Sequence, residues 1–281
     1  MDLGASSDAA RMPVPALGTV LCAVDSSPAA KAVLYAAAGL AAHPGSRLVV
    51  VRVVGRLSSE DEREAAQVAL NAFAHETIPA WIGYRQETDL VAAAGDPAKA
   101  ILSIAEERGA NLIVMGMHSR TGLARMLFGS VTASVLEKTK VPVAVVPPSG
   151  PELISLTNDG AVPHVGSVLV PVDLRGQTAR QLSWASTLSL ASAREITLLH
   201  VIPPKADSTG PLHRLREMAG CVDSHSGVVA VVTHGPLVDV ILDRQKRARA
   251  GVVVLGRDAA SPGHVAFELL ERARAIVVFV P

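Results

Sequence analysis

The sequence is poor in aromatic residues and cysteine, and neither sign of charge is in excess. Aromatic residues make up 3% of its 281 positions and hydrophobic residues 49%, so its cores must be built from Ala, Val, Leu and Ile. Two cysteines, Cys22 and Cys221, are too few for a disulfide framework and are typical of a reducing compartment. Lys and Arg number 26, as do Asp and Glu, so no general field attracts nucleic acid or an anionic membrane. These absences favour a cytoplasmic protein that binds neither nucleic acid nor membrane.

Several common signals are also missing. Residues 1–16 lack a basic start and an apolar run, so we expect a disordered N-terminal tail and no signal peptide. No apolar run approaches the ~18 residues that span a bilayer. The chain has no G-x-x-x-x-G-K-[ST] motif, and no G-x-G-x-x-G follows a strand. A phosphate site in this chain must therefore be built on another pattern.

The sequence does contain an internal repeat. Four apolar segments recur in the same order, at an offset that falls from 148 to 140 and then 134 residues. The matching segments are 20–25 with 168–173, 47–54 with 195–202, 112–116 with 252–256, and 142–147 with 276–281. The falling offset indicates deletions in the second copy. We predict two tandem domains, 17–148 and 166–281, joined by a linker at 149–165 that carries Gly, Pro, Asn and Asp.

Apolar strands alternate with helical patterns within each copy. In the first copy we expect strands near 19–25, 47–54, 85–91, 111–115 and 142–146, and helices near 28–42, 60–77, 97–108 and 130–139. The strand segments are continuously apolar, which suits strands buried on both faces of a parallel sheet. Ser59 with Glu62 predicts a capping box, and Asp96 before Pro97 predicts another helix start. The alternation predicts a doubly wound α/β sandwich in each copy.

The most informative segment follows the fourth predicted strand. Gly116 ends that strand, and Gly129 and Ser130 open the next helix. The first N–H groups of a helix lack partners and carry partial positive charge, so this place suits a phosphate. Because ligands of doubly wound sheets bind at the carboxyl ends of strands, we expect Asp25 to face the same crevice. The alternative is an ordinary strand-to-helix turn capped by Ser130.

Taken together, these features resemble the universal stress protein family. The resemblance rests on Gly116 and Ser119, on Gly129–Ser130 after nine intervening residues, on the strand segment 141–146, on Val24–Asp25 and on Gly95–Pro97. It implies two tandem α/β sandwich domains, each with a five-stranded, mainly parallel sheet. It also implies that the first domain binds ATP, with ADP and AMP as alternatives and Mg accompanying the nucleotide.

The resemblance gives each candidate residue a role. The phosphates would lie on N–H groups around the glycine loop, the nucleoside would lie at the end of the first strand, and the adenine would meet the backbone of the second. These residues are Met115, Gly116, Ser119, Gly129, Ser130 and Val131 for the phosphates, Ala23, Val24 and Asp25 for the nucleoside, and Val53 for the adenine. No residue is assigned to catalysis or to a metal.

Two departures from the family pattern bear on binding. Ser119 replaces the family's second Gly, which costs ~1–2 kcal/mol if that position needs a positive φ. In the second copy, 257–259 follow Gly256, the loop is shorter, and His264 stands where Ser130 stands. Asp258 would repel a phosphate. We therefore expect binding in the first copy and a degenerate site without triphosphate in the second.

The predicted function is an ATP-binding regulatory or stress-response module. Family members commonly pair through the final strand of each domain, so the resemblance implies an intramolecular pseudo-dimer, with a homodimer as an alternative and an unidentified protein partner. Phosphoryl transfer needs a metal-holding carboxylate near the phosphates, and Asp25 is the only clear candidate in the first copy. We expect no enzyme, or at most weak ATP hydrolysis. A slow ATPase and a nucleotide-free interaction module are the alternatives.

A metal site in the second copy is a weaker hypothesis. His213, Cys221, His225 and His234 lie near one another in sequence, but the tight paired spacing of zinc sites is missing. We expect surface histidines and a buried cysteine instead.

Overall fold

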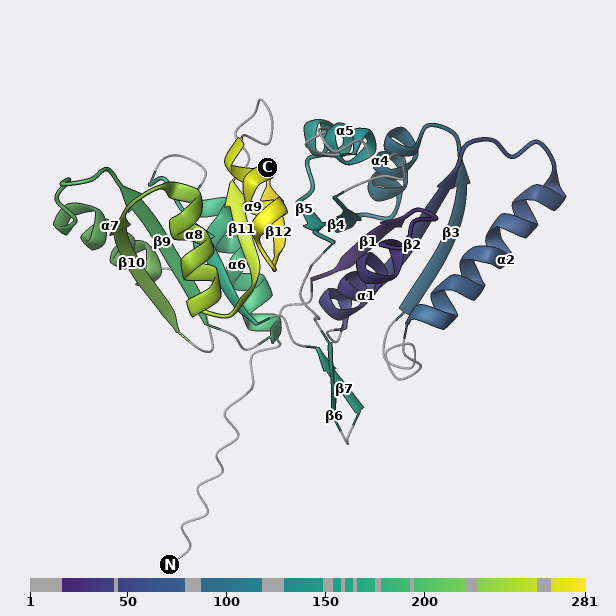
Figure 1. The fold of residues 1–281 in the computed structure, drawn as a ribbon. Coiled ribbons are helices and arrows are strands. Elements are labelled where there is room, and N and C mark those ends of the chain that lie inside the picture. Colours follow the sequence, from purple (N-terminus) through teal and green to yellow (C-terminus); the bar gives the residue numbers. More distant parts are fainter. Residues whose placement is uncertain are drawn as a thin grey trace, which may run out of the picture.

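The computed structural model describes residues 17–42, 45–78, 87–117, 129–148, 154–157, 160–163, 166–174, 178–192, 195–220, 227–256 and 264–281. Within them, strands and helices alternate in both halves of the chain (Figure 1). The strands are β1 (Thr19–Val24), β2 (Arg47–Val54), β3 (Glu87–Ala94), β4 (Ala110–Gly116), β5 (Val143–Val146), β6 (Ile154–Thr157), β7 (Gly160–Pro163), β8 (Ser167–Pro171), β9 (Ile196–Ile202), β10 (Val228–His234), β11 (Ala250–Gly256) and β12 (Ile276–Val280). The helices are α1 (Ala30–Ala41), α2 (Glu60–Thr77), α4 (Pro97–Glu107), α5 (Ser130–Lys138), α6 (Thr178–Ser192), α7 (Thr209–Gly220), α8 (Leu237–Arg247) and α9 (His264–Arg272).

One ten-stranded sheet runs through both halves, in the order β10-β9-β8-β11-β12-β5-β4-β1-β2-β3. Neighbouring strands within each half are parallel. The halves meet where β12 pairs antiparallel with β5, with Val278 opposite Ala144. The winding reverses between β1 and β4 and again between β8 and β11. The predicted fold of two tandem doubly wound α/β domains with five-stranded sheets is confirmed.

Helices cover both faces of the sheet (Figure 1). The side chains of β1 alternate, so Cys22 packs in the core under α1, α2, α6 and α7, while Leu21 packs in the core under α4 and α5. Ala266 and Leu270 of α9 belong to that second core as well, so it continues across the β5–β12 junction. Cys22 is fully buried, as predicted for a small core residue.

Both predicted helix starts are confirmed. The backbone N–H of Glu62 donates to Ser59 Oγ at 3.2 Å, and the Glu62 carboxylate accepts from the N–H of Ser58. At α4, the N–H of Lys99 donates to Asp96 Oδ1 at 2.9 Å, and Pro97 follows as the first helical residue. The second cap fixes where α4 begins, which places its first turn beside the carboxyl ends of β1 and β2.

Two segments differ from the sequence-based expectation. β3 continues to Ala94 and does not end at residue 91, because the small residues that follow still pair with β2. Within the interval predicted as a linker, β6 and β7 form an antiparallel hairpin of their own. In the described part of the chain, no helix combines the length and apolar character needed to cross a membrane.

Candidate functional site

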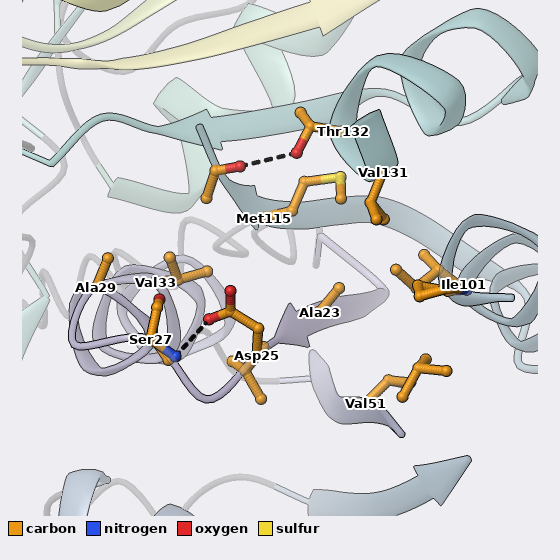
Figure 2. Close-up of a pocket in the computed structure, with 15 residues that line it drawn as sticks. Ala23, Asp25, Ser27, Ala29, Val33, Val51, Ile101, Met115, Val131 and Thr132 are labelled. Carbon is orange, nitrogen blue, oxygen red and sulfur yellow. Dashed lines mark hydrogen bonds between the residues drawn. The ribbon is translucent and has the colours of Figure 1, made fainter. Parts of the chain in front are cut away.

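A cavity of about 310 Å³ opens at the carboxyl ends of β1, β2 and β4, beside α1, α4 and α5 (Figure 2). It lies where the winding of the first domain reverses, which is where doubly wound folds bind their ligands. Its volume is at the lower end of the range of small-molecule pockets, about 300–1,000 Å³. Its lining residues are Ala23, Val24, Asp25, Ser27, Ala29, Ala30, Val33, Val51, Val53, Pro97, Ile101, Met115, Gly116, Val131 and Thr132.

The cavity brings together most of the residues predicted for a nucleotide site. Those that line it are Ala23, Val24, Asp25, Val53, Met115, Gly116 and Val131. Gly129 and Ser130 immediately precede Val131 at the start of α5 but do not belong to the lining. Ser119 lies outside the described residues, and so do the other residues of the loop at 118–128.

Sequence reasoning missed the lining residues that come from α1 and the segment before it, from the interior of β2, from α4 and from the first turn of α5. They are Ser27, Ala29, Ala30, Val33, Val51, Pro97, Ile101 and Thr132. For Pro97 a signal was present, since the Gly95–Pro97 segment carried part of the family resemblance. For the others the sequence offers no local mark, because ordinary core residues reach the cavity only through the strand order.

Asp25 is the only titratable side chain among the lining residues that the structure describes. Its Oδ1 accepts a hydrogen bond of 2.9 Å from the N–H of Ser27, which turns the chain from β1 into α1. This bond leaves the second carboxylate oxygen available to a donor in the cavity. Figure 2 shows Asp25 beyond the end of β1, between Ser27 and Ala23.

A cation lies near Asp25 on the other face of the sheet. Arg52 pairs in register with Val24, and its guanidinium carbon lies 4.6 Å from the centroid of the Phe73 ring. Burial lowers the pKa of Arg52, and the charge of Asp25 opposes that shift. The charge of Asp25 is thus partly balanced from outside the cavity.

The start of α5 is tied to the end of β4 by two hydrogen bonds. The N–H of Gly129 donates to the carbonyl of Met117 at 3.0 Å, and Thr132 Oγ1 donates to the carbonyl of Gly116 at 2.9 Å (Figure 2). Gly129 is the N-cap and provides no side-chain acceptor for the first helical N–H groups. Within the described residues, no side chain caps these groups, and a helix start in this state is the arrangement that binds anions.

The second half is built differently at the corresponding place. Gln181 of α6, which stands where Val33 stands in α1, is buried, and its Nε2 donates to the carbonyls of Pro171 and Val254 at 3.1 and 3.4 Å. This side chain joins the ends of β8 and β11. His200, at the position of Arg52, contacts the carbonyl of Val172 through Nδ1 at 2.7 Å. Asp258, expected to repel a phosphate, lies outside the described residues, as do its neighbours at 257 and 259.

The residues of the weaker metal hypothesis have other contacts where the structure describes them. His213 contacts Glu217 within α7 at 3.3 Å, and His234 Nε2 contacts the carbonyl of Ala206 at 3.0 Å. Cys221 and His225 lie outside the described residues. Among the residues described, no group of three or more His, Cys, Asp and Glu side chains is placed to hold a metal ion.

The sequence of the first domain matches known proteins. The profile of the universal stress protein family matches residues 17–147. The chain is 40% identical over 65 residues to universal stress protein MJ0577 of Methanocaldococcus jannaschii, which covers 23% of this chain and 39% of that protein. It is 33% identical over 93 residues to universal stress protein YxiE of Bacillus subtilis, which covers 33% of this chain and 60% of that protein. The matches thus span less than two thirds of either relative.

The fold is shared over nearly the whole chain. The crystal structure of a universal stress protein from Archaeoglobus fulgidus superposes with a TM-score of 0.69 at 20% identity, covering 93% of this chain and 97% of that one. At this identity the likeness concerns the fold alone. It extends over both halves, whereas the sequence profile concerns the first. Residues 17–147, which make up the first domain, thus match the universal stress protein family.

Proposed function

We propose that the first domain binds an adenine nucleotide and that its occupancy regulates the interaction of the protein with a partner. The observation that carries this proposal is the cavity at the strand-order reversal, which has Asp25 at one side and the uncapped start of α5 at another. A carboxylate that accepts hydroxyl hydrogen bonds and a helix start that receives an anion are the two polar anchors that a nucleotide needs.

The apolar wall of the cavity supports the orientation of the ligand. Val51, Val53 and Ile101 line it together, and such side chains suit the faces of a purine ring. With the base on this wall, the ribose hydroxyls reach the second oxygen of Asp25 and the phosphates extend towards Gly116 and α5. The residues present therefore fit the group. ATP is the proposed ligand, and Mg would offset phosphate charge that none of the described lining residues neutralises.

The proposed role is binding without catalysis. A phosphoryl-transfer site needs carboxylates that hold a metal beside the phosphates, and Asp25, the titratable lining residue, is assigned to the ribose. The second domain is proposed to pair with the first in an intramolecular pseudo-dimer, and the β5–β12 pairing supports that role. A cytoplasmic location, where ATP is available, belongs to the same proposal.

The test is to denature purified protein, quantify the released nucleotide per chain, and titrate nucleotide-free protein with ATP, ADP and AMP by calorimetry. cAMP, which is bound in the crystal structure of another universal stress protein, completes the panel. We expect one adenine nucleotide per chain. Val131→Phe, which fills the cavity from α5, should abolish binding, whereas Val68→Phe, on the exposed face of α2, should not.

Three outcomes would contradict the proposal or part of it. No bound nucleotide after purification together with no heat in any titration would favour a nucleotide-free interaction module. Two nucleotides per chain would overturn the assignment of the site to the first domain alone. Turnover of ATP that Val131→Phe removes would favour the slow ATPase.

A further inference from the structure

The ten-stranded sheet ends in two outer edges, β3 on one side of the molecule and β10 on the other (Figure 1). An edge strand presents unpaired backbone groups that can pair with another chain, and proteins usually protect such edges. The edge of β3 is protected by Gln67 of α2. Its Nε2 donates to the carbonyl of Leu90 at 2.9 Å, and its Oε1 accepts from the N–H of Ala92 at 3.0 Å. The side-chain amide thus occupies the place of a further strand.

Charge also protects the β3 edge. Asp89 of β3 pairs with Arg47 and with Arg108, the latter at 2.9 Å, and Glu87 lies 3.5 Å from Arg47. A second copy of β3 placed against this edge would have to accommodate these groups. The β3 edge is therefore protected from strand pairing in two ways, by the side-chain amide of Gln67 and by the charged side chains around Asp89.

Among the described residues, the β10 edge has neither a side-chain amide bonded to its backbone nor charged residues along the strand. Its sequence from Val228 to Thr233 is free of charge and proline, and the side chain of Val229 is 41% exposed. The hydrogen bond from the N–H of Ile196 to the carbonyl of Gly227 determines which residues of β10 bond to β9, because in the ladder every second residue does so. In a parallel ladder this pattern directs the N–H and C=O groups of Val228, Ala230 and Val232 away from β9.

These outward groups are accessible in the described part of the chain. No described side chain hydrogen-bonds to the backbone of Val228, Ala230 or Val232 as Gln67 does at β3. Beside the strand, a groove of about 690 Å³ lies between the end of α7 and β10. It is lined by Arg216, Ala219, Gly220, Gly227, Val228, Val229 and Ala230. The groove leaves room for the side chains of an added strand.

We propose that this edge binds a second copy of the chain, through antiparallel pairing of β10 with β10. Two identical strands can pair about a twofold axis because the outward groups repeat every second residue and match themselves when the direction is reversed. The strand brings no like charges into opposition, whereas β3 would. The proposal does not depend on nucleotide binding, because β10 lies in the half of the chain without the candidate nucleotide cavity.

The experiment measures the mass of the full chain in solution by light scattering over a concentration series. Wild-type protein is expected at twice the chain mass of 29.1 kDa. Ala230→Pro removes one outward N–H and leaves the β9 ladder intact, so it should yield monomer over the whole series. Val229→Lys, beside two outward-facing residues, should raise the dimer dissociation constant about tenfold.

The control is Val68→Lys, which adds the same charge at a site that is 58% exposed on α2, and it should leave the dimer unchanged. Circular dichroism and urea unfolding establish that each variant is folded. Wild-type monomer at every concentration would overturn the proposal, and so would a folded Ala230→Pro protein that stays dimeric. If Ala230→Pro does not fold, Val229→Lys decides, and an unchanged dimer would overturn the proposal.

Discussion

The two halves of the chain have the same strand order and differ in what occupies the carboxyl ends of their strands. In the first half a cavity lies beside Val33 and Thr132. In the second half Gln181 takes the place of Val33 and joins the ends of two strands, and Ala266 takes the place of Thr132. The described side chains at these strand ends thus differ between two copies of one fold, so function has to be argued from the site and not from the fold.

The sharpest test of this difference compares Asp25→Asn with Asp173→Asn, the same change at corresponding positions. Asp25→Asn keeps an oxygen for the N–H of Ser27 but removes the charge that faces the cavity. Hydrogen bonds to charged groups contribute about 1.5–3 kcal/mol. We therefore expect ATP affinity to fall roughly ten- to 150-fold. Asp173→Asn should leave affinity unchanged, as calorimetry would measure. Equal losses in both variants would mean that the halves are not specialised.

A second prediction concerns the hydrogen bond between Thr132 and the carbonyl of Gly116. The second half has Ala266, without a hydroxyl, at the position of Thr132. Thr132→Val keeps the shape of this buried side chain and removes the hydroxyl that donates to the carbonyl of Gly116. The free energy of unfolding should fall by about 1–2 kcal/mol, because the carbonyl loses its partner. Urea unfolding measures this loss. Ser134→Ala, on the same helix, should change it by less than about 0.5 kcal/mol. A stable Thr132→Val protein would show that the bond does not hold α5 to β4.

Arg52 and His200 stand at corresponding positions of the two halves. Replacing Arg52 by His tests how much its contact with the ring of Phe73 stabilises the first half. Arg52→His removes the guanidinium over the ring of Phe73, a contact of about 0.5–1 kcal/mol. We expect a decrease of that size in the free energy of unfolding. Arg56→His, at an exposed position just beyond β2, serves as the control and should have no effect. An equal decrease in both variants would remove the argument for the stacked contact.

Much of the fold could be predicted from the sequence because its signals are local. Continuous apolar runs mark strands that are covered on both faces, and Ser59 and Asp96 mark helix starts through bonds to residues three positions on. The hairpin of β6 and β7 could not be predicted, since turn residues over so short a segment are also typical of a linker. The capping of β3 by Gln67 depends on where α2 packs, which no local pattern encodes.

The residues of the candidate site also divide into those that the sequence predicts and those that it does not. Asp25 follows the end of β1 and Gly116 ends β4, and strand ends are visible as the points where apolar runs stop. Val51 and Ile101 are core residues by composition, and only the neighbouring positions of β2, β1 and α4 bring them to the cavity. Core residues in the interior of an element, such as Val51 and Ile101, thus escape sequence reasoning, while residues at the ends of strands do not.

The last comparison of the two halves concerns Cys22, whose counterpart in the second half is Val170. Burial raises the pKa of the Cys22 thiol well above its ordinary value. A thiol in the unfolded chain ionises near pH 8.5. Below that pH the thiol is protonated in both states, so its contribution to stability is fully present. As the pH rises further, only the unfolded state loses its proton, and the free energy of unfolding falls by about 1.4 kcal/mol per pH unit.

Cys22→Val gives the first half the residue of the second and removes this dependence. At pH 7 the two proteins should differ by less than about 1.5 kcal/mol, since the side chains are of similar size. Between pH 8.5 and 10 their unfolding free energies, measured in urea under reducing conditions, should diverge in favour of the variant. Every other residue is the same in the two proteins, so its contribution cancels in the difference. Parallel curves would mean that Cys22 gains access to water in the native state, and that the β1 core of the first half is looser than that of the second.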